Sequence, residues 1–200
     1  MVKNIFITFI IPTLGRLSLL NSIESLINQD DSQWKAIIIF DGVKNNLEIN
    51  DERITIIETE KKNSAGDVRN FGFNYIENSE WIGFLDDDDC LSFNYISRLK
   101  EEIEINNNIE VCIFRMGYEN KSILPTKNDR NIIRNKVGIS FAIKKYISEN
   151  ILFNNNPYED FIFLKEIQRK KYKILISSYV CYFVRIKQYE CNIFPKILIN

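Results

Sequence analysis

Histidine is absent from the 200 residues of this sequence. Its absence excludes every Ser-His-Asp or Cys-His nucleophile system within the chain, together with zinc and iron sites that rely on histidine ligands. Acid–base chemistry near neutral pH must therefore come from carboxylates, lysine, tyrosine or cysteine.

Long apolar runs are also missing. The longest one near the start, Ile5–Ile11, is interrupted by Thr8 and is far shorter than the ~20 residues that a membrane-spanning helix needs. Pro12, Leu14 and Arg16 follow it without a small-residue cleavage site, which argues against a secretory signal peptide. We therefore expect a buried strand here and no segment that spans a bilayer.

The sequence has too few cysteines to suggest a framework of disulfide bonds. Cys90, Cys112, Cys181 and Cys191 form no Cys-x-x-Cys pair, and a chain of this length can be stable without disulfides, so we interpret all four as reduced cytosolic thiols. The 26 basic and 27 acidic residues leave a net charge of −1, which gives no overall attraction to nucleic acid. With 45% hydrophobic and 26% charged residues, the composition indicates one folded domain.

Strand and helix patterns alternate along the chain, which predicts an α/β fold on a mostly parallel sheet. Continuous apolar runs predict strands, and apolar residues at three- and four-residue spacing predict helices. The expected strands are Ile5–Ile11, Ala36–Phe40, Arg53–Ile57, Trp81–Leu85, Val111–Met116, Ile139–Ala142, Ile174–Ile176 and Tyr179–Ile186. The expected helices are Leu17–Gln29, Ser64–Glu77, Asn94–Asn106, Lys144–Ser148 and Pro157–Lys171, with a mobile loop at Lys121–Lys136.

Four consecutive aspartates, Asp86–Asp89, follow the strand Trp81–Leu85 at its carboxyl end, the edge where open α/β sheets bind ligands. Adjacent carboxylates repel one another, and a strand end offers no obvious cationic partners, so a bound divalent cation is the natural neutraliser. In an extended chain the first and third aspartates would point to one side and the second and fourth to the other. All-oxygen ligation suits Mg²⁺ or Mn²⁺. The alternative is a solvated acidic turn that ends the strand.

Other polar residues are expected at the same edge of the sheet. Thr13 and Arg16 follow the first strand, Asp41 ends the second, and Arg69 and Asn70 lie on the helix that leads into the fourth. Each has a simpler explanation alone, such as a helix cap for Thr13, an ordinary turn for Asp41 or a surface cation for Arg69. Their joint placement indicates a binding site.

Five segments resemble, in order and spacing, the family-two glycosyltransferases of the GT-A fold, which transfer a sugar from a nucleotide diphosphate sugar. They are Phe9–Arg16, Ile37–Gly42, Asn63–Asn70, Phe84–Asp89 and Pro157–Asp160. The resemblance covers about Phe6 to Lys173 and implies a single Rossmann-like GT-A domain over residues 1–200, with a nucleotide-sugar half at 1–90 and an acceptor half at 91–200.

The resemblance also implies roles for individual side chains on the donor side. Asp41 would accept a hydrogen bond from the base, which we expect to be uracil, Arg69 would lie beside the base or a phosphate, and Asp86 or Asp87 would hold the ribose. The full set of expected nucleotide-binding residues is Pro12, Thr13, Arg16, Asp41, Gly66, Arg69, Asp86 and Asp87.

For the chemistry, the resemblance implies a metal site and a general base. Asp88, the last residue of the Asp-x-Asp motif, would ligate Mn²⁺ or Mg²⁺ together with Asp86, while Asp89 braces the loop. Asp160 would be the base, with Glu159 beside it, and which of these neighbours takes the proton is left open.

The expected function is transfer of one sugar, with inversion, from a UDP-sugar to a carbohydrate or lipid-linked saccharide acceptor in surface polysaccharide or glycolipid synthesis. The Gln-x-x-Arg-Trp signature of processive synthases is absent, since Gln168–Tyr172 has neither its spacing nor its tryptophan. We expect a cytoplasmic protein with at most peripheral membrane contact; the stretch Tyr179–Lys196 is the candidate, although a strand packed on the sheet fits it better. A homo-oligomer is left open.

Two other functions remain alternatives at this point. A sugar nucleotidyltransferase would share the sheet and an acidic metal site, but it normally has a glycine-rich basic turn after the first strand, where Pro12–Arg16 has one glycine and one arginine. A non-catalytic nucleotide-binding protein is the other.

Overall fold

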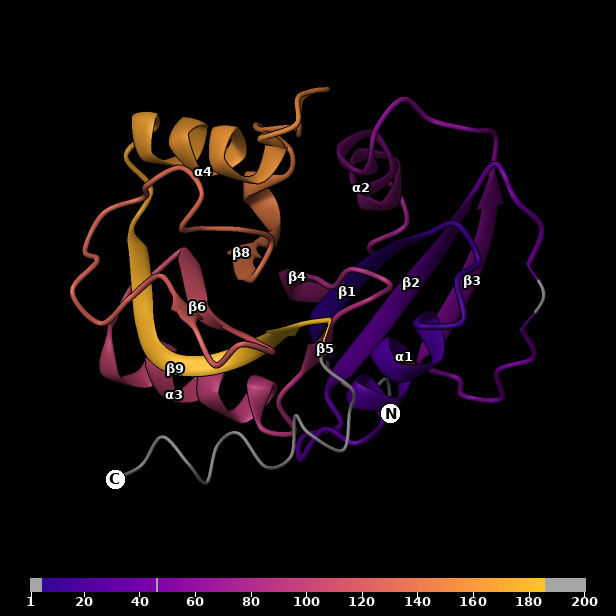
Figure 1. Ribbon diagram of the computed structural model, residues 1–200, viewed down its shortest axis with the longest axis horizontal. Coiled ribbons are helices and arrows are strands. Elements are labelled where there is room, and N and C mark those ends of the chain that lie inside the picture. Colours follow the sequence, from indigo (N-terminus) through magenta and orange to yellow (C-terminus); the bar gives the residue numbers. More distant parts are fainter. Residues whose placement is uncertain (1–4, 46, 186–200) are drawn as a thin grey trace.

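One curled sheet runs through the computed structural model, which describes residues 5–45 and 47–185, and helices cover both of its faces (Figure 1). The strand order is β3-β2-β1-β4-β8-β6-β9-β5, and β7 pairs with β6. The strands are β1 (Ile5–Thr13), β2 (Trp34–Asp41), β3 (Ile54–Thr59), β4 (Ser79–Phe84), β5 (Cys90–Leu91), β6 (Val111–Tyr118), β7 (Ile123–Leu124), β8 (Phe141–Lys144) and β9 (Ile174–Val184). The helices are α1 (Leu19–Ile27), α2 (Ala65–Phe73), α3 (Tyr95–Ile105), the 3₁₀ turn η1 (Lys145–Ile147) and α4 (Glu159–Arg169).

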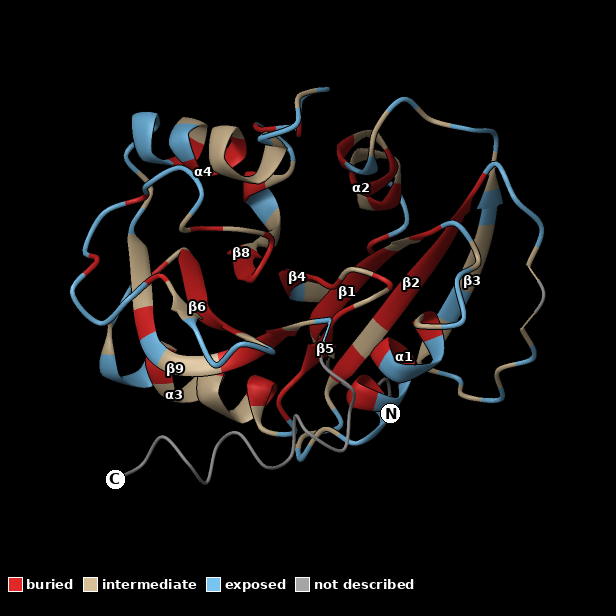
Figure 2. Cartoon of the chain, in the orientation of Figure 1, coloured by how far each residue is buried: buried red, intermediate tan, exposed pale blue. Residues whose placement is uncertain are grey.

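The first four strands pair in parallel, so their carboxyl ends meet at one edge. The apolar runs of β1, β2 and β4 are buried on both faces, which suits strands that helices cover on either side, and Figure 2 shows β1 and β2 almost wholly buried; β3, at the edge, is partly exposed. β1 lies between β2 and β4: the chain runs outward from β1 to β2 and β3 and then returns to the other side of β1 at β4. Such a reversal opens a crevice at the carboxyl ends of the strands, where α/β proteins bind ligands.

Helices α2 and α4 lie on one face of the sheet, and α1 and α3 on the other (Figure 1). The Ser64 hydroxyl caps α2 by accepting a hydrogen bond from the Asp67 backbone nitrogen at 3.1 Å, as the capping-box pattern predicts. The helix packs tightly on β1 and β2 at Gly72, where a Cβ would lie 2.9 Å from Ile10 and 2.8 Å from Ile39.

Stacked phenylalanines fix α4 above the sheet. The rings of Phe153 and Phe163 lie 4.1 Å apart, and Phe163 also stacks on Phe141 of β8 at 5.8 Å. Phe84, at the end of β4, meets Phe153 edge-on at 5.3 Å. This cluster places the amino end of α4 next to the carboxyl end of β4.

Strand β9 replaces the two strands that the sequence predicts in this region. It is continuous from Ile174 to Val184 and pairs with β6 along its length, with register shifts around Arg115, while its last residues also pair with β5 on the other side. Its last residues therefore reach the segment that follows β4. The predicted strand end at Ile186 and the rest of the stretch up to Lys196 lie outside the described residues.

The predicted α/β class with a mostly parallel sheet is confirmed, whereas the division into two halves stays a prediction. The expected loop Lys121–Lys136 contains the short strand β7.

Cys112 and Cys181 are free, as expected, and both are buried, but Cys90 is disulfide-bonded, so the interpretation of it as a thiol is wrong. Cys191 lies outside the described residues. In the described part of the chain, no helix has the length and apolar character needed to cross a membrane.

Candidate active site

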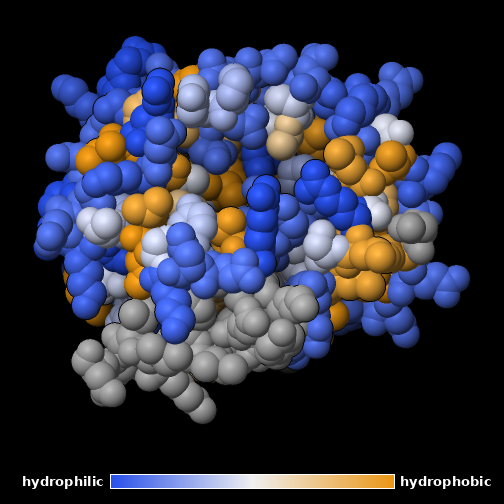
Figure 3. Space-filling view, in the orientation of Figure 1, coloured by the Kyte–Doolittle hydropathy of each residue, from blue (hydrophilic) through white to orange (hydrophobic). Residues whose placement is uncertain are grey.

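A cavity of about 610 Å³ opens at the carboxyl ends of β1, β2 and β4, between α2 and the start of α4. Hydrophilic side chains dominate this face of the molecule (Figure 3). Almost every residue that the sequence singles out lines the cavity: Pro12, Thr13, Arg16, Asp41, Arg69, Asp86, Asp87, Asp88, Glu159 and Asp160. The exceptions are Gly66, Asn70 and Asp89.

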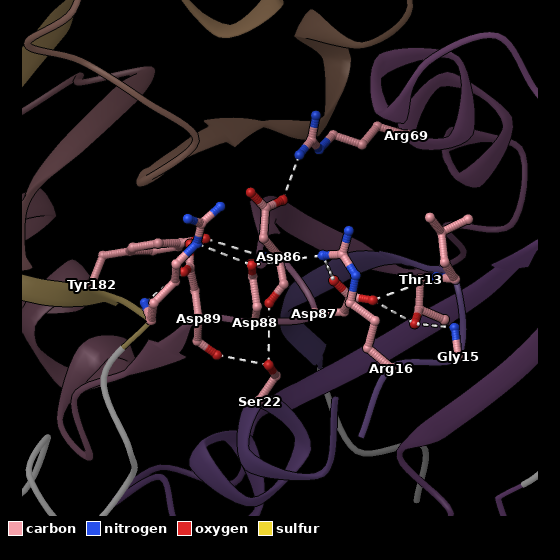
Figure 4. Close-up of polar contacts among 12 residues, drawn as sticks. Thr13, Gly15, Arg16, Ser22, Arg69, Asp86, Asp87, Asp88, Asp89 and Tyr182 are labelled. Atoms are coloured by element: carbon pink, nitrogen blue, oxygen red, sulfur yellow. Dashed lines mark hydrogen bonds and ion pairs between the residues drawn. The ribbon is translucent and has the colours of Figure 1, made fainter. Parts of the chain in front are cut away.

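The loop after β1 braces Asp87. The hydroxyl of Thr13 donates to the Asp87 carboxylate at 2.7 Å, and Arg16 donates to its other oxygen at 3.1 Å (Figure 4). The Thr13 hydroxyl also accepts from the backbone nitrogen of Gly15, whose φ of +75° favours glycine. Thr13 therefore faces the cavity while holding one wall of it in place.

Asp41, at the end of β2, is buried and already has two donors. One oxygen accepts from the ammonium of Lys61 at 2.7 Å, and the other accepts from the backbone nitrogen of Lys62 at 2.6 Å. A carboxylate oxygen has a second lone pair, so each can still accept from a ligand. The two lysines are part of the site, although no motif in the sequence identified them.

The four aspartates form a turn and are not extended. The backbone nitrogen of Asp89 donates to the carbonyl oxygen of Asp86 at 3.2 Å, and the Ser22 hydroxyl of α1 lies 3.1 Å and 2.7 Å from the carbonyl oxygens of Asp86 and Asp89. The hydroxyl of Tyr182 accepts from the Asp86 nitrogen at 3.1 Å and donates to the Asp89 carboxylate (Figure 4). The predicted alternation of sides is therefore wrong, because the first three aspartates all line the cavity.

The expectation that these carboxylates lack cationic partners is also wrong. Arg16 lies 3.1 Å from Asp87 and 3.6 Å from Asp88, and Arg185 lies 3.2 Å from Asp88. The cations come from the loop after β1 and from the end of β9, which the fold brings to the turn from distant parts of the sequence.

Arg69 of α2 lies at the centre of a carboxylate cluster, with its side chain 3% exposed. Its guanidinium donates to Asp86 at 2.5 Å and to Glu159, and it lies 3.9 Å from Asp160. Burial lowers the pKa of Arg69, but the three carboxylates outweigh this effect and hold the pKa above its ordinary value. Arg69 was expected beside the base or a phosphate, which stays a prediction; in the structure it lines the cavity and joins the acidic turn to α4.

Asp160 and Glu159 are neighbours in sequence with different surroundings. Glu159 accepts hydrogen bonds from Arg69 and from the backbone nitrogen of Gly66. Asp160 is 28% exposed, and within the described residues its buried oxygen Oδ1 has no hydrogen-bond partner. Burial raises the pKa of Asp160 to about 7 despite the opposing effect of Arg69, and the charges of Asp86 and Glu159 add to the rise.

Gly66 was expected to bind the nucleotide, but it lies behind the cavity wall. A Cβ at this position would be 2.5 Å from the Glu159 carboxylate and 2.7 Å from Phe153, so its open side faces α4 and the segment just before it. The glycine is required by the close approach of these two elements.

A sequence model described as glycosyl transferase family 2 matches residues 8–188. The chain belongs to this family. A curated relative from Haemophilus influenzae, an uncharacterized glycosyltransferase, is 28% identical over 156 residues, which cover 70% of this chain and 53% of the relative. The chain thus spans about half the length of that relative.

Solved structures of S. aureus TarS share the fold of this family 2 chain. TarS 1–349 in complex with UDP is 18% identical with a TM-score of 0.72, and the match covers 94% of this chain and 63% of that one. The complex with UDP-GlcNAc is 16% identical with a TM-score of 0.73, and the match covers 90% and 58%.

The family resemblance left several site residues unidentified. Ser22 carries the clearest signal, because it is a polar residue on the apolar side of α1, between Leu19 and Ile23. Tyr182 lies within an apolar strand pattern and gives no such signal. Arg185 was predicted to be part of the closing strand Tyr179–Ile186, so it was not identified as a site residue.

Among the described residues, no group of three or more His, Cys, Asp or Glu side chains is arranged to hold a metal. Mg²⁺ in proteins commonly has only one or two carboxylate ligands and completes its shell with substrate phosphates and water. Asp88 and Asp86 both line the cavity, and Asp88 is 26% exposed. Its arginine partners are exposed as well, so a cation could replace them without leaving a buried charge unpaired. The residues present fit a site of this kind.

Proposed function

We propose that this family 2 protein transfers one sugar, with inversion, from a UDP-sugar to a carbohydrate or lipid-linked saccharide acceptor. One observation carries the proposal: Asp160, a carboxylate with an unpartnered oxygen and a pKa raised to about 7, shares a cavity with the acidic turn. A base whose pKa lies near the working pH is suited to take a proton from a hydroxyl. The TarS complexes with UDP and UDP-GlcNAc support the choice of donor.

In the proposed reaction, the acceptor hydroxyl oxygen forms a bond to the anomeric carbon while the bond from that carbon to the diphosphate oxygen breaks. The hydroxyl proton goes to the Asp160 carboxylate, and the nucleoside diphosphate leaves with the bonding electrons. Attack from the face opposite the leaving group inverts the anomeric centre.

We assign Asp88 and Asp86 to a Mn²⁺ or Mg²⁺ ion, which would neutralise the charge that develops on the diphosphate. Thr13 and Arg16 shape the nearby wall by bracing Asp87. Asp41 is the proposed acceptor of a hydrogen bond from the uracil ring, beside its contacts with Lys61 and Lys62.

We further propose single addition in surface polysaccharide or glycolipid synthesis, at the cytoplasmic side of a membrane. The missing processive signature supports single addition. A mass-spectrometric time course tests it, since products longer by several sugars on one acceptor would contradict it.

The direct test of the function needs no acceptor, because water can take the place of the hydroxyl. Purified protein is incubated with Mn²⁺ and, in turn, UDP-GlcNAc, UDP-glucose and UDP-galactose, and release of UDP is measured. Metal-dependent UDP release from one of them is expected. Release of pyrophosphate from UTP and a sugar phosphate would instead favour the nucleotidyltransferase, and binding of UDP without any turnover would favour a binding protein.

A further inference from the structure

Helix α2 holds the α4 side of the cavity through a set of polar contacts. The Gly66 backbone nitrogen donates to one oxygen of Glu159 at 2.8 Å, and Arg69 donates to the other oxygen. Asn70 donates to the carbonyl oxygen of Phe153 at 2.9 Å and accepts from its backbone nitrogen at 2.9 Å. The segment Gly66–Asn70 therefore contacts both α4 and the chain just before it.

The fit around Glu159 leaves no room for another side chain. A Cβ on Gly66 would lie 2.5 Å from the Glu159 oxygen Oε2 and 2.7 Å from the Phe153 Cβ, distances that real Cβ atoms do not show. Glu159 is mostly buried, with its side chain 14% exposed, and both of its oxygens have donors. It therefore has no unpartnered oxygen, unlike Asp160.

The position of Arg69 explains what Glu159 does for its neighbour. The same guanidinium nitrogen that donates to Glu159 lies 3.9 Å from Oδ1 of Asp160, beyond hydrogen-bond distance. If Glu159 did not occupy this nitrogen, Asp160 would be the nearest carboxylate to bind it. The charged groups that act on Asp160 are Arg69 on α2, Asp86 on the acidic turn and Glu159 on α4 itself.

We propose that Glu159 is a positioning residue: anchored on Gly66 and Arg69, it sets the start of α4 against α2 and keeps Arg69 from binding Asp160. This inference rests on the proposed function, because it takes Asp160 as the base. It assigns Gly66, Arg69 and Asn70 to the support of the base and not to contact with the nucleotide.

The test uses Glu159→Gln and the UDP-sugar that the wild-type protein hydrolyses fastest. Affinity for UDP with Mn²⁺ should stay within about two-fold, while kcat for UDP release falls roughly ten-fold or more. The midpoint of the acidic limb of the kcat–pH profile should also move to lower pH, because the Glu159 charge that raises the pKa of Asp160 is gone and Arg69 then pairs with Asp160 and favours its ionised form. A general loosening of the structure would also weaken metal-dependent UDP binding, which is expected here to stay within about two-fold.

Two further variants make the test independent of how Glu159→Gln folds. Gly66→Ala should displace the Glu159 carboxylate and shift the profile in the same direction. Glu166→Gln removes an exposed carboxylate of the same helix, which pairs with Arg169, and should change neither kcat nor the midpoint. An unchanged kcat and midpoint in both Glu159→Gln and Gly66→Ala would overturn the role of Glu159. A wild-type protein that hydrolyses no UDP-sugar would instead overturn the proposed function itself.

Discussion

The hydroxyl of Tyr182 accepts a hydrogen bond from the backbone nitrogen of Asp86 at 3.1 Å, although the two residues lie 96 positions apart in the sequence. The same hydroxyl donates to Asp89, so one side chain of β9 fixes both ends of the acidic turn. The turn depends on a contact that forms only when the end of β9 pairs with β5, the strand directly after the turn.

Tyr182→Phe should therefore lower both stability and ligand affinity. It leaves a backbone N–H and a buried carboxylate without this partner, which costs about 1–3 kcal/mol in the free energy of unfolding. We also expect weaker Mn²⁺-dependent UDP binding, because the turn loses its fixed geometry. Urea unfolding and calorimetry measure the two effects. Tyr146→Phe, which removes an exposed hydroxyl bonded to Glu110, is the matched control; equal effects of both variants would contradict the account.

Asp88→Asn should abolish metal-dependent nucleotide binding while the fold survives, since it removes a negative ligand from a partly exposed position. Calorimetry of UDP binding, once with Mn²⁺ and once with a chelator, measures this. The control is Asp51→Asn, which lies just before the amino end of β3, away from the cavity. This variant should bind UDP with the wild-type, metal-dependent affinity. If the variant keeps its Mn²⁺-dependent affinity, Asp88 is not the ligand. If the wild-type protein binds UDP equally with the chelator, Arg16 and Arg185 neutralise the diphosphate instead.

Asp41→Ala should weaken uridine and UDP by a similar factor, because the contact that is lost is to the base. The variant also frees the ammonium of Lys61, which could then gain a contact with the diphosphate. Competition binding with uridine and UDP separates these effects. Equal affinity of wild type and variant for uridine would show that Asp41 only holds Lys61 and Lys62.

Asp160 should make stability depend on pH. Its folded-state pKa of about 7 lies above its ordinary value of 3.8, so between these values the folded protein binds the proton more readily than the unfolded chain. The contribution of this group to stability is thus present at low pH and is lost as the pH rises through the folded pKa. Asp160→Asn should gain stability relative to wild type from about pH 5 to about pH 8. A constant difference in urea unfolding over that range would contradict the raised pKa.

The sequence was sufficient to predict the elements that build the site. Apolar runs identified the first four strands, and the Ser64–Asp67 pattern identified the start of α2, because these signals are local. Boundaries were less accurate: α2 ends at Phe73 and not near Glu77. The motifs also predicted which loops meet, since the carboxyl ends of parallel strands share an edge.

Contacts between distant residues were not predictable in the same way. The turn at Asp86 is set by Ser22 and Tyr182, and its charges are balanced by arginines that precede and follow it by many residues. Gly66 was assigned to the nucleotide as part of the motif Asn63–Asn70 that resembles the family. Here it allows close approach of Glu159, which only the packing of α4 on α2 reveals.

The most direct test of the account is the pair of measurements on Asp160→Asn: calorimetry of UDP with Mn²⁺, and the rate of UDP release from the preferred UDP-sugar. The account predicts unchanged metal-dependent UDP affinity with a rate reduced by ~10²-fold or more, the scale of general-base loss. Release of UDP at the wild-type rate would show that the base lies elsewhere and would contradict the proposed mechanism.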